Sequence, residues 1–204
     1  MMRKSWLCLS IAAFVVTMGA SSAARGADVL ASEGAPPPSP FERPFALGAN
    51  AVGWAGGYTA GGVGGRVRWE FLPRALGIDL VSEHLIVDWP GGLRHDHPFG
   101  FNVYVPIALS KGVRVRPLLG FCTVLSFVEP KHAGAPRADD ILVGAHGGAG
   151  IEIAVDERVS WFLDAQAIVY LAHDRTTRDW TGQVASNVGP IAVFQPATGL
   201  QLHL

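Results

Sequence analysis

The chain is poor in cysteine, almost neutral in net charge, and without a long apolar run beyond its first residues. Of 204 residues only two are cysteine. Cys8 falls in a leader segment described below, so Cys122 stands alone in the rest of the chain. A disulfide framework and a cysteine-based zinc site are therefore excluded. The formal net charge is −1 and the sequence holds no basic run, so no nucleic-acid partner is expected.

The missing apolar runs limit how the chain can cross a membrane. After the leader, no run reaches the roughly 20 residues that a spanning helix needs. Because only helices and closed barrels span a bilayer, a membrane form of this protein must be a barrel. Hydrophobic residues make up 49% and charged residues 16%, which does not fit intrinsic disorder. The 25 glycines suit β-structure and turns better than helices.

Residues 1–27 have the pattern of a signal peptide. Positive charge comes first, at Arg3 and Lys4, and an apolar segment of the usual length follows over residues 6–20. Small residues at 22–24 then suit cleavage by signal peptidase, near Ala24 or Ala27. A short membrane anchor is the alternative, but the apolar segment is too short to span. Residues 28–44 are rich in proline and are expected to form an extended periplasmic tether.

From Phe45 to Leu204, apolar and polar residues alternate with a period of two. The clearest segment runs from Glu157 to Leu171, where the odd positions are apolar and most even positions are polar. Successive side chains of a strand point to opposite faces, so each such segment is expected to be a strand with one apolar face. Eight segments of this kind follow one another, and most reach the roughly 9–11 residues of a tilted membrane strand. The sequence predicts an all-β fold, an eight-stranded antiparallel up-and-down transmembrane β-barrel.

The expected connections differ in length on the two sides of the barrel. Short links near Pro73, at residues 110–112 and at Asp156-Glu157 alternate with longer ones. The longer links are expected at residues 55–62, 89–97, 128–140 and 172–187. Short turns on one side and long loops on the other are typical of bacterial outer-membrane barrels. Both barrel termini would then lie on the periplasmic side.

Periodicity alone does not show which face is inside, because a soluble barrel would place its apolar face inward. The apolar face carries Trp, Phe or Leu on nearly every strand, which suits lipid contact better than a packed interior. The polar face is rich in glycine, which makes room for long side chains in a narrow lumen. Ten charged residues of that face are expected to form a structural charge network: Arg66, Arg68, Glu70, Asp79, Glu83, Arg114, Arg116, Glu152, Arg158 and Asp164. An unpaired charge there costs several kcal/mol, so we expect the charges to compensate each other and the lumen to be plugged.

The run from Gly147 to Trp161 resembles the paired strands of the OmpA-like and opacity-protein barrels. It combines a glycine-rich strand, an acidic residue, a tight polar turn and a strand of alternating character. The resemblance covers roughly residues 45–204 and is one of pattern, without a unique motif. It implies a monomer in the outer membrane, in contact with membrane lipid and lipopolysaccharide and inserted by the barrel-assembly machinery. Members usually end in an aromatic residue, whereas this chain ends in Leu204.

Ser82 and His84 raise the question of an enzyme. They lie two residues apart on the expected lipid-facing side, near the long-loop end, and resemble the Ser/His pair of barrel deacylases. Nucleophilic catalysis also needs a group that orients the base, and the adjacent strand over residues 99–109 offers no outward carboxylate. We favour the interpretation that both are polar residues at the membrane interface.

Two further sets of residues were weighed as sites. His95, Asp96 and His97 lie in an expected long loop and are acceptable metal ligands, but their adjacency restricts the geometry, and a solvated loop is favoured. His146 is expected to form a hydrogen bond in the lumen. The sequence contains no nucleophile elbow, phosphate loop or paired-cysteine site. No catalytic, cofactor-binding or metal-binding residue is therefore predicted, and no cofactor.

The pattern as a whole predicts a non-enzymatic outer-membrane barrel with a plugged polar lumen and a structural or surface-interaction role in the cell envelope. Because function resides in sites and not in folds, two alternatives stay open. One is a lipid-modifying outer-membrane barrel enzyme of the acyl hydrolase type. The other is a secreted soluble barrel that binds a small ligand.

Overall fold

The computed structural model describes residues 39–56, 59–72, 75–89, 92–130, 138–171 and 192–204. The expected signal peptide and most of the expected tether lie outside the described residues. One 3-10 turn, η1 (Pro40–Glu42), precedes the strands. The strands are β1 (Phe45–Gly56), β2 (Ala60–Leu72), β3 (Leu76–Trp89), β4 (Gly92–Tyr104), β5 (Ile107–Ala108), β6 (Val113–Pro130), β7 (Ala138–Ala154), β8 (Val159–Tyr170) and β9 (Ala192–His203).

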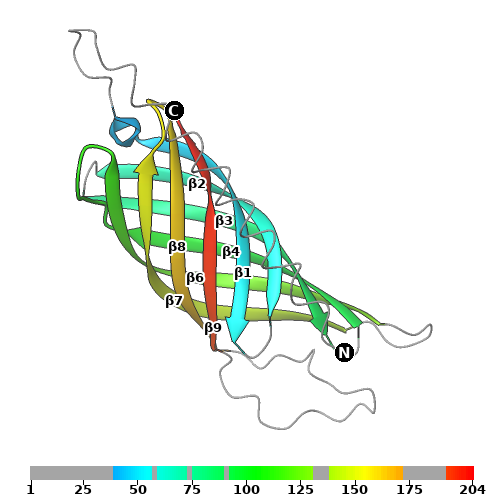
Figure 1. The fold of residues 1–204 in the computed structure, drawn as a ribbon. Coiled ribbons are helices and arrows are strands. Elements are labelled where there is room, and N and C mark those ends of the chain that lie inside the picture. The colour runs from blue at the N-terminus through cyan, green and yellow to red at the C-terminus, as the bar shows by residue number, and fades with distance from the viewer. Residues whose placement is uncertain (1–38, 57–58, 73–74, 90–91, 131–137, 172–191) are drawn as a thin grey trace, which may run out of the picture.

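The strands close into one antiparallel barrel, as predicted. Each long strand pairs with its neighbour in the chain, and the pairing of β1 with β9 joins the two ends of the sequence. Figure 1 shows the resulting tilted barrel, with η1 and the C-terminus at the same end. β5 continues β4 along the edge of β6. Pro106 has no N–H to donate, so the ladder with β6 is interrupted between β4 and β5. These two segments together form one strand of the barrel wall, and the described strands therefore make an eight-stranded barrel.

Two of the expected long loops are wrong. β1 and β2 are separated by three residues in place of a loop over 55–62, and β3 and β4 by two residues in place of a loop over 89–97. Gly56, Gly61 and Gly62 carry no side chain, so the alternation is invisible in the sequence there although the backbone pairs regularly. In β4 the alternation is masked because His95 and His97 occupy positions that are apolar elsewhere. The connections over residues 131–137 and 172–191 lie outside the described residues.

The wall of the barrel is apolar outside and polar inside over much of its height. Leu163 and Val169 point outward and are 42% and 40% exposed, whereas Asp164 between them is fully buried. Arg114 is buried in the same interior. This arrangement is the inverse of a soluble barrel, and it confirms the predicted orientation of the two faces. Within the described part of the chain, no helix is long and apolar enough to cross a membrane.

Aromatic side chains gather on the outer wall at the end that carries the C-terminus. Phe45 of β1 stacks on Trp69 of β2 with ring centroids 5.8 Å apart, and Trp69 meets Phe71 edge-on at 5.7 Å. All three rings are partly exposed. A belt of this kind is characteristic of strands that pass through a lipid–water boundary.

Candidate functional site

The lumen holds a buried network of arginines and carboxylates, centred on Glu152. Its carboxylate lies 2.6 Å from the Arg68 guanidinium, 3.1 Å from that of Arg114 and 3.2 Å from that of Arg116. Arg114 is the direct cross-strand partner of Glu152, since β6 pairs with β7. Arg68 reaches the same carboxylate from β2, so this contact joins two sectors of the barrel.

Two aspartates extend the network. Asp79 lies opposite Arg68 on the adjacent strand, with 2.7 Å between the Arg68 Nε and the carboxylate. Asp164 on β8 accepts from Arg66 at 2.6 Å and from Arg116 at 2.8 Å. The Arg114 guanidinium also lies 2.6 Å from the carboxylate of Glu70. Four guanidinium groups thus meet four carboxylates, and the formal charges of the group balance.

Two of the ten expected network residues are placed differently. Arg158 is exposed on the turn between β7 and β8, where its backbone N–H donates to the Asp156 carboxylate at 2.7 Å. The prediction that Arg158 lies in the lumen is wrong, because the alternation was carried one residue too far into the turn. Glu83 is buried as expected, but its partners are amides: Asn50 donates to it at 2.9 Å and Gln195 at 3.0 Å.

The network is covered at one end by residues that the sequence analysis did not single out. Phe41, in η1, lies under the Arg114 guanidinium at 4.3 Å and meets the His203 ring at 6.0 Å. The Tyr104 hydroxyl donates to Glu70 at 3.0 Å. The last residues of the expected tether therefore pack against the barrel. Phe41 belongs to the proline-rich segment over residues 28–44, and nothing in the composition of that segment predicts that its side chain contacts the barrel.

Glycines of the polar face give these long side chains their space. A Cβ atom at Gly77 would collide with the ring of Tyr104, and one at Gly150 would collide with the Asp164 carboxylate. Both positions therefore need glycine for close approach by another side chain.

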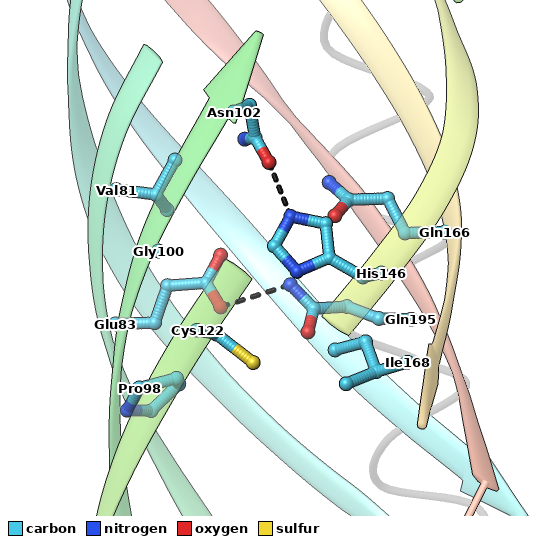
Figure 2. Close-up of a pocket in the computed structure, with 10 residues that line it drawn as sticks. All are labelled: Val81, Glu83, Pro98, Gly100, Asn102, Cys122, His146, Gln166, Ile168 and Gln195. Carbon is cyan, nitrogen blue, oxygen red and sulfur yellow. Dashed lines mark hydrogen bonds between the residues drawn. The ribbon is translucent and has the colours of Figure 1, made fainter. Parts of the chain in front are cut away.

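Figure 2 shows a second polar group in the lumen, in which the amides of Asn102, Gln166 and Gln195 lie around the His146 imidazole. His146 pairs through Nε2 with the side-chain oxygen of Asn102, which confirms the expected hydrogen bond in the lumen. Glu83 and Gln195 face each other in the same group. A cavity of about 20 Å³ is lined by these side chains together with Cys122. Such a volume holds about one water molecule.

The end of the lumen opposite the C-terminus holds a cluster of apolar side chains beside the buried ion pair of Arg94 and Asp96, and the sequence analysis predicted neither. Leu85, Val124 and Leu142 are fully buried there. The Trp54 indole donates to Gln195 at 2.7 Å, and its ring lies 6.1 Å from that of Tyr170. The cluster consists of Val52, Trp54, Ala60, Leu85, Val87, Cys122, Val124, Leu142, Ile168, Tyr170, Val193 and Ala197.

Comparison with solved structures agrees with this geometry. Neisserial surface protein A superposes with a TM-score of 0.59 at 11% sequence identity, and the match covers 78% of this chain and 97% of that one. The attachment invasion locus protein Ail of Yersinia pestis gives a TM-score of 0.49 at 12% identity, over 79% of this chain and 97% of that one. The N-terminal β-barrel domain of Pseudomonas aeruginosa OprF gives 0.44 at 12% identity, over 78% and 97%. The fold is that of a small eight-stranded outer-membrane β-barrel.

Sequence comparison assigns this outer-membrane barrel to no family. No protein-family model matches the chain, and no curated protein matches it. At 11–12% identity the structural likeness concerns the fold alone.

On the outer wall of this outer-membrane barrel, Ser82 and His84 face away from the carboxylates that neighbour them in the strands. Ser82 is exposed and His84 is partly exposed, both facing outward from β3. The carboxylates next to them, Glu83 on β3 and Asp96 on β4, are buried on the lumen side. Asp96 there accepts from Arg94 at 2.7 Å. Neither carboxylate is placed to orient the His84 ring.

The three histidines of this region lie together. His95 and His97 belong to β4 and not to a loop, which corrects the expectation of a solvated loop. The Nδ1 atoms of His84 and His97 lie 3.3 Å apart. The His95 ring centroid lies 5.4 Å from that of His84. Sequence reasoning treated these residues as two separate features because nothing in the sequence gave the register of β3 against β4.

Proposed function

We propose that this outer-membrane barrel is a non-enzymatic, closed monomer with a structural or surface-interaction role in the cell envelope. The observation that carries the proposal is the contrast between the two faces of the wall. Large apolar side chains such as Phe121, 66% exposed, meet the lipid. Inside, four arginines and four carboxylates are buried and paired with one another. The interior therefore stabilises the barrel and offers no open path.

Two successive barriers support a plugged lumen. An ion entering from the C-terminal end meets the paired charges around Glu152, whose separation costs several kcal/mol. It then meets the apolar cluster around Trp54 and Leu142, where water is disfavoured. Either barrier alone narrows the lumen, and the two in series close it to hydrated ions.

The two ends of the barrel support an orientation in the membrane. Connections over residues 73–75, 109–112 and 155–158 are short and lie at the end that also carries η1 and the C-terminus (Figure 1). At the other end, the strands are joined by two short connections, over 57–59 and 90–91, and by two longer ones, over 131–137 and 171–191. Because outer-membrane barrels place short turns in the periplasm, we infer that both termini are periplasmic. The end of the barrel with the two longer connections then faces outward, where lipopolysaccharide and external surfaces are the available partners. Insertion by the barrel-assembly machinery is part of this proposal.

The closed lumen predicts an electrically silent protein. Purified protein incorporated into planar lipid bilayers is expected to give no large, stable single-channel steps, because both barriers are intact. An Arg158→Gln variant, altered only at an exposed turn, serves as the matched control and is expected to be equally silent. Large and long-lived open channels from the folded wild-type protein would contradict the plugged lumen.

Among the residues that the structure describes, no carboxylate is placed to orient His84 beside Ser82, and we therefore expect that the protein does not modify lipid A. Mass spectra of lipid A from cells with and without the gene are expected to show the same acyl pattern. The same comparison with a Ser82→Ala variant tests the hydroxyl directly. An acyl pattern that changes with the gene and reverts in the Ser82→Ala variant would overturn the non-enzymatic proposal in favour of an acyl hydrolase.

A further inference from the structure

Three imidazoles interrupt the apolar outer wall on β3 and β4. The residues beside them on the neighbouring strands are apolar: Val63 of β2 pairs with His84, Leu125 of β6 with His97, and Phe127 of β6 with His95. The carboxylates of the same strand segments, Glu83 and Asp96, have their partners inside the lumen, so the pairing of these groups does not require histidine on the outer face. Histidine is the commonest metal ligand among side chains, so this cluster is a candidate ligand set on an otherwise apolar wall.

The ring nitrogens of His84 and His97 lie within hydrogen-bond distance of each other, and this spacing also suits two ligands of one metal ion. The register places these residues opposite each other, between the pairs Ser82–Phe99 and Leu85–Asp96. Their Nδ1 atoms lie 3.3 Å apart and their ring centroids 4.5 Å apart. Two nitrogens bound to a tetrahedral zinc ion at 2.0–2.1 Å are separated by about 3.3 Å, so this spacing needs little adjustment.

His95 supplies a third imidazole on the same face. It stands two residues before His97 on β4, and side chains two apart on a strand point to the same side. Its ring centroid lies 5.4 Å from that of His84. Within the described residues, no three His, Cys, Asp or Glu side chains already converge on one point. The pair His84 and His97 is the part of the set that already meets, and the site proposed next requires the His95 side chain to turn toward it.

We propose that His84, His95 and His97 form a binding site for one divalent transition-metal ion on the outer wall. Imidazole ligands favour Zn²⁺, Cu²⁺ and Ni²⁺ over Mg²⁺ and Ca²⁺. Three imidazoles leave one coordination position open for water or another oxygen ligand. The site goes beyond the proposed envelope role and does not depend on whether the lumen is closed.

The height of the site on the barrel gives an ion access from water. On the barrel strand formed by β4 and β5, outward apolar residues run from Phe99 to Leu109. At the usual rise and tilt this stretch covers about 25 Å along the barrel axis, which is the height of the lipid-facing band. His97 is the next outward position beyond it, at the end opposite the C-terminus. The ring cluster thus lies at the membrane boundary, which on the proposed orientation is the outer leaflet.

The test is metal binding by the full chain in detergent micelles, purified without a polyhistidine tag. Titration with ZnCl₂ in a calorimeter at about pH 7.5, where imidazole is mostly neutral, is expected to show one bound ion per chain. Cu²⁺ bound in its place is expected to show nitrogen coupling in the electron paramagnetic resonance spectrum. His84→Ala and His97→Ala are each expected to weaken Zn²⁺ binding more than about tenfold. Loss of a residue that only hydrogen-bonds a metal ligand already weakens binding by about that factor, and loss of the ligand itself costs at least as much. His95→Ala is expected to weaken binding as well.

Controls separate this site from the other histidines. Thr123→Ala changes an outward residue of β6 and is expected to bind Zn²⁺ as the wild type does. A His132→Ala/His173→Ala variant removes two histidines outside the described residues and is expected to retain binding. Heat-dependent gel mobility shows that each variant is folded. Folded wild-type protein that binds neither Zn²⁺ nor Cu²⁺ at millimolar concentration overturns the proposal, and so does a His84→Ala/His97→Ala variant that binds like the wild type. Unchanged binding by His95→Ala overturns the three-imidazole assignment.

Discussion

Replacing Glu152 with Gln is expected to lower the free energy of unfolding by about 3–5 kcal/mol, the usual cost of removing one partner from a buried ion cluster. The substitution keeps the shape of the side chain and removes its charge. Arg68, Arg114 and Arg116 would then surround a neutral amide and leave a net positive charge in the lumen. The loss is measured by urea unfolding in micelles, followed by tryptophan fluorescence.

The matched control for Glu152→Gln is a charge change outside the network. Arg158→Gln alters an exposed turn residue and is expected to change the free energy of unfolding by less than about 0.5 kcal/mol. A Glu152→Gln barrel as stable as the Arg158→Gln barrel would mean that the charges in the lumen are solvated and not mutually compensated. The plugged-lumen proposal would then lose one of its two barriers.

The strands and the orientation of their faces could be predicted because the chain itself records the difference between lipid and lumen. In β8, Leu163 and Val169 alternate with Asp164 and Gln166, and the structure places the first pair outside and the second inside. A period of two is a local property of the backbone, so it needs no knowledge of neighbouring strands. Eight strands of this length are enough to close a small barrel, so the closed fold could be predicted as well.

The apolar cluster could not be predicted because alternation vanishes where both faces are apolar. Near the end of β3, Leu85 and Val87 point inward while Ile86 between them points outward. No contrast in polarity then marks which side is the lumen. The early start of β4, within the expected loop over 89–97, has another origin, because His95 and His97 mask the alternation there.

Contacts between distant residues were also beyond the sequence. Whether His84 meets His97 depends on the register of β3 against β4, and a slip of one residue would send one ring into the lumen. The contact of Arg68 with Glu152 requires the barrel to close, because these residues lie on β2 and β7. Composition revealed the balance of charges, and only the closed barrel shows which charges pair.

Placing an arginine at the middle of the outer wall is expected to destabilise the barrel in lipid by about 2–4 kcal/mol. Leu119 of β6 is the position of choice, since it is 71% exposed and lies midway along the outward apolar positions between Val113 and Leu125. Leu119→Arg would bury a guanidinium among acyl chains, where neither water nor a carboxylate reaches it. The cost is measured by reversible unfolding from phospholipid vesicles.

A depth control makes this result specific to the membrane. Leu109 is also outward and exposed, but it lies at the short-turn end of the same face, near the expected boundary. Leu109→Arg is therefore expected to cost about 0–1 kcal/mol, because its side chain reaches the headgroups. If both variants cost the same, or if neither is affected, the outer wall does not face a hydrocarbon layer centred on Leu119. A difference of more than about 1 kcal/mol between the two variants follows only if lipid surrounds the barrel at that depth.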